Sequence, residues 1–590
     1  MLYRAIASCG KLALVWSVAS IPWLCSWWYF SCLAGWPLND DPFYAKPLET
    51  YSQTGEWQLV KQNGELTASS VGHLALGFVA AAWSEFSYRR LYLACIAQQA
   101  LGVAALYLTS RTLSNSVLTS VLAAASLASF PLFFGHAFTF MTDGPAASWA
   151  SVALCCGTVG VVHLDWRWLL AASIALGWGF WIRQTNGLLF LAPAVAWLLA
   201  ARSTKIGRWH FWLGLAAISL PFCFAIILLE SGLLIESSVS RLADVSPAID
   251  GQYFKNVTIA AYGAILLFGW FSLPWLLFAI RCSFLHAGKL GRRARVLCAS
   301  AASLVFLVSL IPFASTAGRA SITNATGAFI QNAHFGPIFL SDMDEPGRWS
   351  QLGGVEWPLF VWQVLTVASI ASGAAIAWWL AWSVCIGSRS LRENSAVNYL
   401  PHVQVAIGIS VAILCSAAVL IFLIEPHMDR YWLFTLAGMA VWTVVISSLN
   451  RVHVVHSSRD RNWNLACFAW AIVFILFNFC MSTVFTHDML AWNNARWGFV
   501  NEMLDAGMQP EEIDGGRDVN AWLRLDEDPN SMPRQGDSSK WWSGSAKLAI
   551  SVGERPGWQE VKRLPWSSWA TGRAHFLLVL SKTEDQSVEH

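Results

Sequence analysis

The sequence predicts an all-α polytopic membrane protein that carries a small α+β domain at its C-terminal end. Of its 590 residues, 56% are hydrophobic and only 13% are charged, whereas a soluble protein carries about 25% charged residues. The chain also contains many long apolar runs, such as 211–229 and 361–384. About 20 apolar residues are enough for a helix to cross the hydrocarbon core of a bilayer.

We expect 13 membrane-spanning helices. The first apolar run follows Arg4 and Lys11 but lacks a clear cleavage site, so it is expected to stay as an uncleaved helix. The stretch Val71–Trp83 is apolar but too short to span, and it is expected to lie at the interface as a helix. The expected spans are 12–33, 90–110, 115–137, 146–163, 168–182, 187–201, 209–232, 258–280, 296–315, 359–384, 402–424, 431–449 and 463–484.

The distribution of Lys and Arg predicts the orientation of these spans. With the N-terminus in the cytoplasm, the inner loops hold 17 basic residues against 3 acids, which agrees with the excess of basic residues in cytoplasmic loops. Arg89 and Arg90 are exceptions on the outer side, unless Val71–Trp83 does span. We therefore expect an integral protein of a plasma membrane or bacterial inner membrane, with its site and its C-terminal region outside the cytoplasm.

The chain divides into a transmembrane part, 1–485, and a polar C-terminal region, 486–590. The C-terminal region holds 16 acids and 11 basic residues, so it is no basic arm for nucleic acid. Leu548–Val552 and His575–Leu580 are typical of short strands, which predicts a small domain with its own core. The 13 cysteines lie in or beside apolar segments without metal-binding spacing, and they are expected to be buried small hydrophobes.

Polar residues that a membrane protein does not need for insertion gather in the expected outer loops. The first of these loops, 34–89, contains "NDDPFY", and later loops contain "FTFMTDGPAASW", "FWIRQTNGLL" and "LIEPHMDRYWLF". The candidate site residues in these stretches are Asp40, Asp41, Tyr44, His73, Asp143, Arg183, Asn186, His427, Arg430 and Tyr431.

Each of these residues also has a plain structural interpretation. Asp40 and Asp41 before a proline are typical of a turn, and Asp143 before Gly-Pro is typical of a helix N-cap. Arg183 and Arg430 could place their charges among lipid headgroups. As a set on one face, however, the residues offer acids for a base, arginines for a phosphate and aromatic groups for a sugar.

The order of these motifs resembles that of the GT-C membrane glycosyltransferases, in the branch of the protein O-mannosyltransferases and aminoarabinose transferases. That family places Asp-Glu-x-x-Tyr directly after its first helix, and Asp40-Asp41-Pro42-Phe43-Tyr44 keeps the Asp-x-x-x-Tyr spacing. Thr142-Asp143, Arg183 and Arg430-Tyr431 match its later motifs. A Lys-x-Pro-Pro-Gly type stretch of the family is replaced here by "SSVGHLALG".

The resemblance implies inverting transfer of a sugar from a polyprenyl-phosphate donor to an acceptor hydroxyl outside the cytoplasm. Asp40 would be the base, with Asp41 as the reserve candidate, and Asp143 would help to position the acceptor or the base. Arg183 and Arg430, with Tyr431, would hold the donor phosphate. Tyr44, His73, Asn186 and His427 would contact the acceptor or the sugar.

The expected partners are a polyprenyl-phosphate-linked sugar, membrane lipids, and a glycan, lipid or protein of the cell envelope as acceptor. Nucleic acid is not expected. No cofactor is chemically required, although some members of the family use a divalent metal and the acids here could hold one. Other functions stay open: a lipid or sugar transporter or flippase, a GT-C glycan polymerase or ligase, and a non-catalytic assembly or sensor protein.

Overall fold

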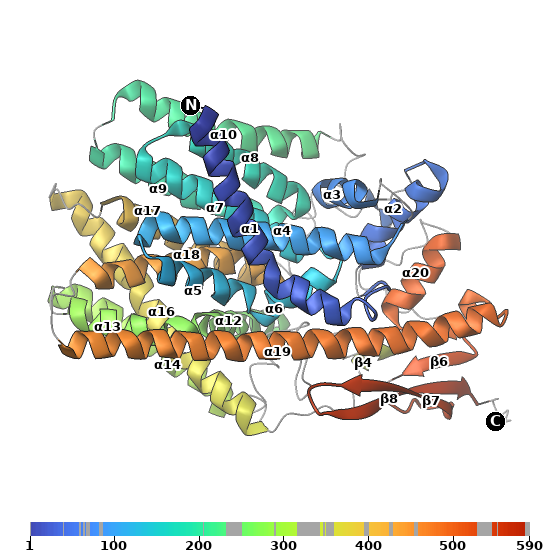
Figure 1. Ribbon diagram of the computed structural model, residues 1–590. Helices are drawn as coiled ribbons and strands as arrows, with labels where there is room; N and C mark the ends of the chain where they lie inside the picture. Colours follow the sequence, from blue (N-terminus) through green and yellow to red (C-terminus); the bar gives the residue numbers. More distant parts are fainter. Residues whose placement is uncertain are drawn as a thin grey trace.

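A computed structural model describes most of the chain. It leaves undescribed the residues 1, 39–40, 58–60, 63–64, 67–70, 82–85, 205, 232–250, 288–290, 315–342, 346–347, 350–358, 394–399, 424–428, 453–457, 528–545, 552 and 584–590. The described part is mostly helical, and its long helices run side by side in one bundle (Figure 1).

The first half of the bundle alternates long helices with short turns and 3₁₀ segments. Its elements are α1 (Leu2–Phe30), α2 (Asp41–Thr54), α3 (Val71–Ala81), α4 (Tyr88–Ser114), α5 (Val117–Ala128), α6 (Pro131–Gly135), η1 (His136–Phe138), α7 (Asp143–His163), α8 (Trp166–Ile182), η2 (Gln184–Phe190), α9 (Leu191–Thr204) and α10 (Arg208–Glu230). A two-stranded hairpin, β1 (Lys61–Gln62) and β2 (Glu65–Leu66), lies between α2 and α3.

The second half contains longer helices. Its elements are α12 (Gly251–Ser272), η3 (Leu273–Trp275), α13 (Leu276–Ala287), α14 (Arg292–Ala314), β3 (Met343–Glu345), β4 (Arg348–Trp349), α16 (Leu359–Glu393), α17 (Leu400–Leu423), η6 (Asp429–Trp432), α18 (Leu433–Val452), α19 (Ser458–Asp505), η7 (Pro510–Glu512), β5 (Ile513–Asp514), α20 (Arg517–Glu527), β6 (Leu548–Ser551), β7 (Trp558–Ser568) and β8 (Arg573–Lys582).

Nine helices of the described residues are long and apolar enough to cross a membrane, or ten if the bent pair Val117–Ala128 and Pro131–Phe138 is one span. They correspond to expected spans. Three further expected spans, 12–33, 168–182 and 431–449, coincide with α1, α8 and α18, which are not among those nine. The prediction of a polytopic all-α protein is confirmed.

Val71–Trp83 was expected to form a short helix, and α3 is such a helix. The start of α4 lies beside the end of α1, because the Arg89 guanidinium donates from Nε to the Ala34 carbonyl over 3.1 Å. Since α1 ends and α4 begins at the same end of the bundle, α3 does not cross it. We call this end, which also carries α2, α20 and the C-terminal sheet, the loop end (Figure 1).

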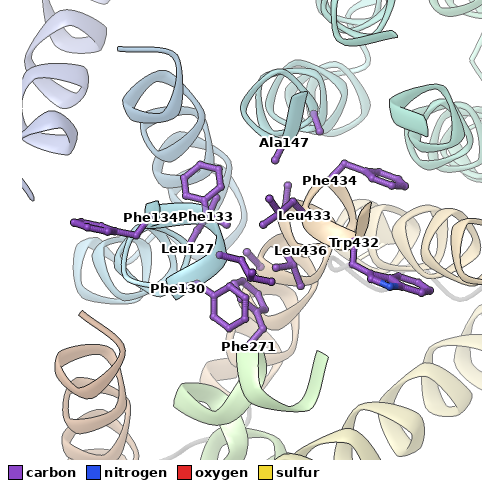
Figure 2. Close-up of a cluster of buried hydrophobic side chains, with 14 of the residues drawn as sticks. Leu127, Phe130, Phe133, Phe134, Ala147, Phe271, Trp432, Leu433, Phe434 and Leu436 are labelled. Atoms are coloured by element: carbon purple, nitrogen blue, oxygen red, sulfur yellow. The ribbon is translucent and has the colours of Figure 1, made fainter. Parts of the chain in front are cut away.

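Aromatic and aliphatic side chains fill the core of the bundle near the loop end. Figure 2 shows the point where α5, α6, α7, α12 and α18 meet. Phe130 and Phe271 pack edge to face with ring centroids 5.3 Å apart, and Leu433 and Leu436 are buried beside them. Because these leucines begin α18, their packing fixes the 3₁₀ turn η6 just before it.

The C-terminal region forms a four-stranded sheet in the order β5-β6-β8-β7, with β5 and β6 parallel and the other pairs antiparallel. The two predicted strands are confirmed as β6 and β8. Strand β7 was not predicted. The region is therefore α+β, because α20 lies between β5 and β6 in the chain.

Helix α19 connects the bundle to this sheet. It is 48 residues long, and it runs the length of the bundle and past its end (Figure 1). Asp488 fastens the β7–β8 hairpin to it: the carboxylate accepts hydrogen bonds from the Ser568 hydroxyl (2.6 Å) and from the Trp569 (2.7 Å) and Ala570 (3.2 Å) amides. The sheet thus packs on the end of α19.

Candidate active site

Asp41 begins α2, and its carboxylate is completely buried. One oxygen, Oδ1, accepts a hydrogen bond from the Phe140 amide (2.9 Å). The other, Oδ2, accepts from the Leu38 amide (3.2 Å) and the Tyr92 hydroxyl (3.3 Å). Asp41 therefore ties the first loop to the segment before α7 and to α4, and both of its oxygens are engaged.

His73 lies in α3, next to the same segment. Its Nε2 is 3.1 Å from the Phe140 carbonyl oxygen, and its ring stacks on the Phe140 ring at 4.0 Å. Tyr44 of α2 meets the His73 ring edge on, at 5.7 Å. Burial lowers the pKa of His73 to about 4, although the Phe140 carbonyl and the Asp143 charge act in the opposite direction. The side chain is therefore neutral at pH 7.

Asp143 and Arg183 form an ion pair in which Nη1 lies 2.8 Å from Oδ1. Asp143 is the first residue of α7, and Arg183 is the residue at which α8 ends with an extended backbone. The same Nη1 donates a hydrogen bond to the Thr142 hydroxyl over 3.1 Å. The Asp143 side chain is 1% exposed and that of Arg183 is 19% exposed, so the carboxylate is shielded from bulk water and the guanidinium is partly exposed.

This pair holds the two charges together without a well-aligned hydrogen bond. Within the described part of the chain, neither carboxylate oxygen of Asp143 has a hydrogen-bond partner. Buried polar atoms are nearly always hydrogen-bonded. The expected N-cap is also wrong: Thr142 occupies the N-cap position and no side-chain cap bond is formed. Among the described residues, the Asp143 carboxylate therefore has an ion-pair partner in Arg183 but accepts no hydrogen bond.

Tyr431 also contacts Arg183. The guanidinium carbon lies 4.5 Å from the centroid of the Tyr431 ring, the geometry of a cation–π contact. Tyr431 belongs to η6, and the packing of α18 described above sets its place. Arg430 precedes it in the same 3₁₀ turn.

Asn186 lies one turn beyond Arg183, in η2, and is completely buried. Its Nδ2 donates to the Ala146 carbonyl of α7 over 2.7 Å. Gly179 makes this possible, because a Cβ there would lie 2.7 Å from Nδ2. Within the described residues, Asn186 Oδ1 has no partner. Asn186 therefore joins η2 to α7 beside the ion pair.

The structure thus gathers six predicted site residues at the loop end, from five separate stretches of the chain. They are Tyr44, His73, Asp143, Arg183, Asn186 and Tyr431. Asp41 is beside them, but it is engaged by main-chain donors. Asp40 and His427 lie outside the described residues, as does the side chain of Arg430. Among the described residues, no group of three or more His, Cys, Asp or Glu side chains could hold a metal ion.

Sequence reasoning did not identify Phe140 or Tyr92. Phe140 acts through its main-chain amide and carbonyl, and a main-chain group leaves no trace in residue type. Tyr92 sits in an apolar helix, where the single proton of its hydroxyl is shared between the Trp36 carbonyl oxygen (2.7 Å) and the Asp41 carboxylate (3.3 Å). A buried tyrosine hydroxyl needs a hydrogen-bond partner, so a tyrosine within an apolar helix could have indicated a polar contact at this position.

The fold and this cluster define a polytopic membrane protein with a buried charged site at one end of its helices. Residues 74–228 match the family model described as dolichyl-phosphate-mannose-protein mannosyltransferase. The matched family is one of glycosyltransferases, and the match confirms the predicted resemblance over a segment that contains Asp143, Arg183 and Asn186. No curated protein matches this sequence.

Three solved structures are similar over most of the chain or a large part of it. ArnT from Cupriavidus metallidurans bound to undecaprenyl phosphate has 15% sequence identity and a TM-score of 0.38, covering 97% of this chain and 98% of that one. AglB from Archaeoglobus fulgidus, in complex with an inhibitory peptide and a dolichol-phosphate, has 13% identity and a TM-score of 0.47, covering 96% and 74%. Arabinosyltransferase EmbB from Mycobacterium smegmatis has 13% identity and a TM-score of 0.32, covering 69% and 41%.

Proposed function

We propose that this protein is a glycosyltransferase that moves a sugar from a polyprenyl-phosphate donor to an acceptor hydroxyl, at the loop end and outside the cytoplasm. The observation that carries the proposal is the buried Asp143–Arg183 pair, whose carboxylate oxygens lack hydrogen-bond donors among the described residues. A substrate hydroxyl supplies such a donor. The pair also lies within the segment that matches the mannosyltransferase family.

In this proposal, Arg183 and Arg430 hold the donor phosphate. Arginine forms paired, charge-assisted hydrogen bonds with phosphate oxygens. The Tyr431 ring lies against the face of the Arg183 guanidinium, so it fixes the plane of the group. The Nε of Arg183 has no hydrogen-bond partner among the described residues, so this N–H can donate to a phosphate oxygen. Arg430 adjoins Tyr431 in the chain.

Asp40 takes the proton in the proposed reaction. As it removes the proton of the acceptor hydroxyl, the acceptor oxygen bonds to the anomeric carbon of the sugar, and the bond from that carbon to the phosphate oxygen breaks. The electron pair stays on the lipid phosphate, where the arginines stabilise the charge. A phosphate is a good leaving group, so the step requires no metal. The occupied lone pairs of Asp41 favour Asp40 over its neighbour.

Asp143 positions the acceptor or the base, and Tyr44, His73, Asn186 and His427 contact hydroxyl groups of the acceptor or the sugar. His73 and Asn186 each have a buried polar atom without a partner among the described residues, and sugars offer several hydroxyls at once. The acceptor is proposed to be a glycan, lipid or protein of the cell envelope.

The test uses the full chain in liposomes with a radiolabelled polyprenyl-phosphate sugar and a cell-envelope extract as acceptor. We expect the wild type to transfer label, and Asp40→Asn to lose transfer while it stays folded, because an amide cannot take a proton. Arg430→Ala should weaken binding of undecaprenyl phosphate more than that of the acceptor. Full activity in both Asp40→Asn and Asp41→Asn would overturn the mechanism, and a change in acceptor affinity alone would overturn the role of Arg430.

A further inference from the structure

The last turns of α19 hold the segment that leads into α2. The Asn493 amide and the Trp497 indole both donate to the Pro37 carbonyl, each over 3.1 Å. The Trp497 ring also stacks on that of Trp36, with centroids 5.6 Å apart and planes 11° apart. These contacts fix the chain four residues before Asp41.

Arg496, on the same turn of α19, fastens α20 in place. Its guanidinium forms an ion pair with Asp518 of α20, and it donates to Asn493 Oδ1 over 2.7 Å and to the Gly515 carbonyl over 3.2 Å. Arg496 is 1% exposed. A buried arginine needs such partners to offset the loss of its hydration, so Arg496 joins α20 to α19.

Helix α20 in turn covers α2. The Lys46 ammonium lies 4.2 Å from the centroid of a Trp522 ring, and the Trp522 ring also stacks on Phe86, just before α4, at 6.3 Å. Phe43 packs in one buried cluster with Ala521 and Leu525. Residues more than 400 positions later in the chain therefore contact the first loop both just before α2 and within α2.

We infer that the C-terminal region acts as the positioning device of the first loop, with Trp497, Arg496 and Trp522 as positioning residues. It is then no separate module that binds an acceptor on its own, since such modules usually meet their neighbours through small polar interfaces. The inference rests on the proposed function in one respect: the loop it positions begins α2 beside the proposed base, Asp40.

Trp522→Ala is the main test, because Trp522 contacts the first loop without belonging to the site. We expect hydrogen–deuterium exchange in α2, residues 41–54, to rise by roughly tenfold or more, since local protection reports local stability. In the transfer assay we expect kcat to fall roughly tenfold or more, because small misplacements of catalytic groups have such effects. The KM for the donor should change by less than about twofold, because donor binding is left intact.

Two further variants and one control sharpen the result. Trp522→Phe keeps an aromatic face over Lys46, so it should retain most of the wild-type protection of α2 from exchange and most of the wild-type kcat. Trp497→Phe keeps the stacking on Trp36 but loses the bond to Pro37, so exchange should rise at the start of α2; it also replaces Trp522→Ala if that variant does not fold. Lys562→Ala, which removes an exposed ion pair of the sheet with Glu502, should match the wild type.

Unchanged exchange in α2 in both Trp522→Ala and Trp497→Phe would overturn the inference. A rise in exchange with kcat unchanged would also overturn it, because the contact would then hold the loop without serving the reaction. If the wild type transfers no sugar, the proposed function fails, but the exchange measurement still decides whether the C-terminal region holds α2.

Discussion

Asp41 and His73 are joined through a single residue: the Phe140 amide donates to Asp41, and the Phe140 carbonyl accepts from His73. A carbonyl can only accept, so His73 must carry its proton on Nε2. In the neutral ring, Nδ1 then presents a lone pair, and it has no partner among the described residues. The first loop, α3 and the segment before α7 thus share one hydrogen-bonded connection, which ends in an acceptor.

The buried neutral state of His73 predicts how stability depends on pH. Its pKa in the folded protein is about 4, below the value of about 6.5 for an unfolded chain, so the unfolded state binds more protons between these values. The contribution of neutral His73 to the free energy of unfolding is then fully present above pH 6.5. It is lost as the pH falls to 4, and the total loss is about 3 kcal/mol. Thermal unfolding of wild type and His73→Gln across this range measures the loss, which should be smaller in the variant. Equal pH dependence in the two proteins would contradict the prediction.

Asp40 and Asp41 should differ in what their replacement removes. Three donors point at the Asp41 carboxylate, and in Asp41→Asn one of them would face an amide NH₂. We expect a loss of about 2 kcal/mol in the free energy of unfolding. Asp40→Asn should keep wild-type stability and lose transfer. Chemical denaturation in detergent, alongside the transfer assay, separates the two effects; a stable but inactive Asp41→Asn would move the base by one position.

Removing one partner of the Asp143–Arg183 ion pair should cost more stability than removing the other. Arg183→Ala leaves the Asp143 charge buried without its partner, and such losses amount to about 3 kcal/mol. Asp143→Ala leaves an arginine that is partly exposed and can reach water, so we expect a smaller loss. Unfolding midpoints of both variants and of the double variant measure the difference. The double variant should be more stable than Arg183→Ala; if it is less stable, Arg183 does not serve mainly to neutralise Asp143.

Asp488 should decide whether the β7–β8 hairpin stays docked. In Asp488→Ala, the Ser568 hydroxyl and the Trp569 and Ala570 amides lose their acceptor, and an unsatisfied buried donor costs about 1–3 kcal/mol. Limited proteolysis should then cut the hairpin faster than in the wild type. Ser568→Ala is the matched control: it leaves the carboxylate bonded to the two amides and removes only the Ser568 hydroxyl, which also accepts from the Thr571 amide, so its hairpin should be cut more slowly than that of Asp488→Ala.

Much of this fold could be predicted because membrane-spanning helices are visible in the sequence as long apolar runs. A span must satisfy its backbone internally and present apolar side chains to lipid, so α4, α7, α16 and α17 are legible as apolar runs. Strands β6 and β8 were predicted from runs such as "HFLLVL". Strand β7 was not, because it lies at the edge of the sheet and its first half is exposed. It also contains Pro565, which an edge strand tolerates.

The side chains of the candidate site could be predicted from the sequence, but the contacts that they make with other residues could not. Asp143 and Arg183 are charged residues beside apolar runs, which marks them at once. The role of Asp41 depends on the Phe140 amide, a group that every residue but proline possesses. The grip of the C-terminal region on the first loop joins residues more than 400 positions apart, and nothing in the local pattern near Pro37 or Trp497 indicates the partner.

Helix α19 has one more consequence. At 48 residues it is about 72 Å long, more than twice the roughly 30 Å of a hydrocarbon core. Within the bundle, Asn478 accepts a hydrogen bond from Trp270, and farther along the same helix Asp488 and Trp497 hold the sheet and the first loop. A thinner or thicker bilayer that tilts this helix therefore displaces the sheet, α20 and the loop together, which makes hydrophobic mismatch a determinant of site geometry.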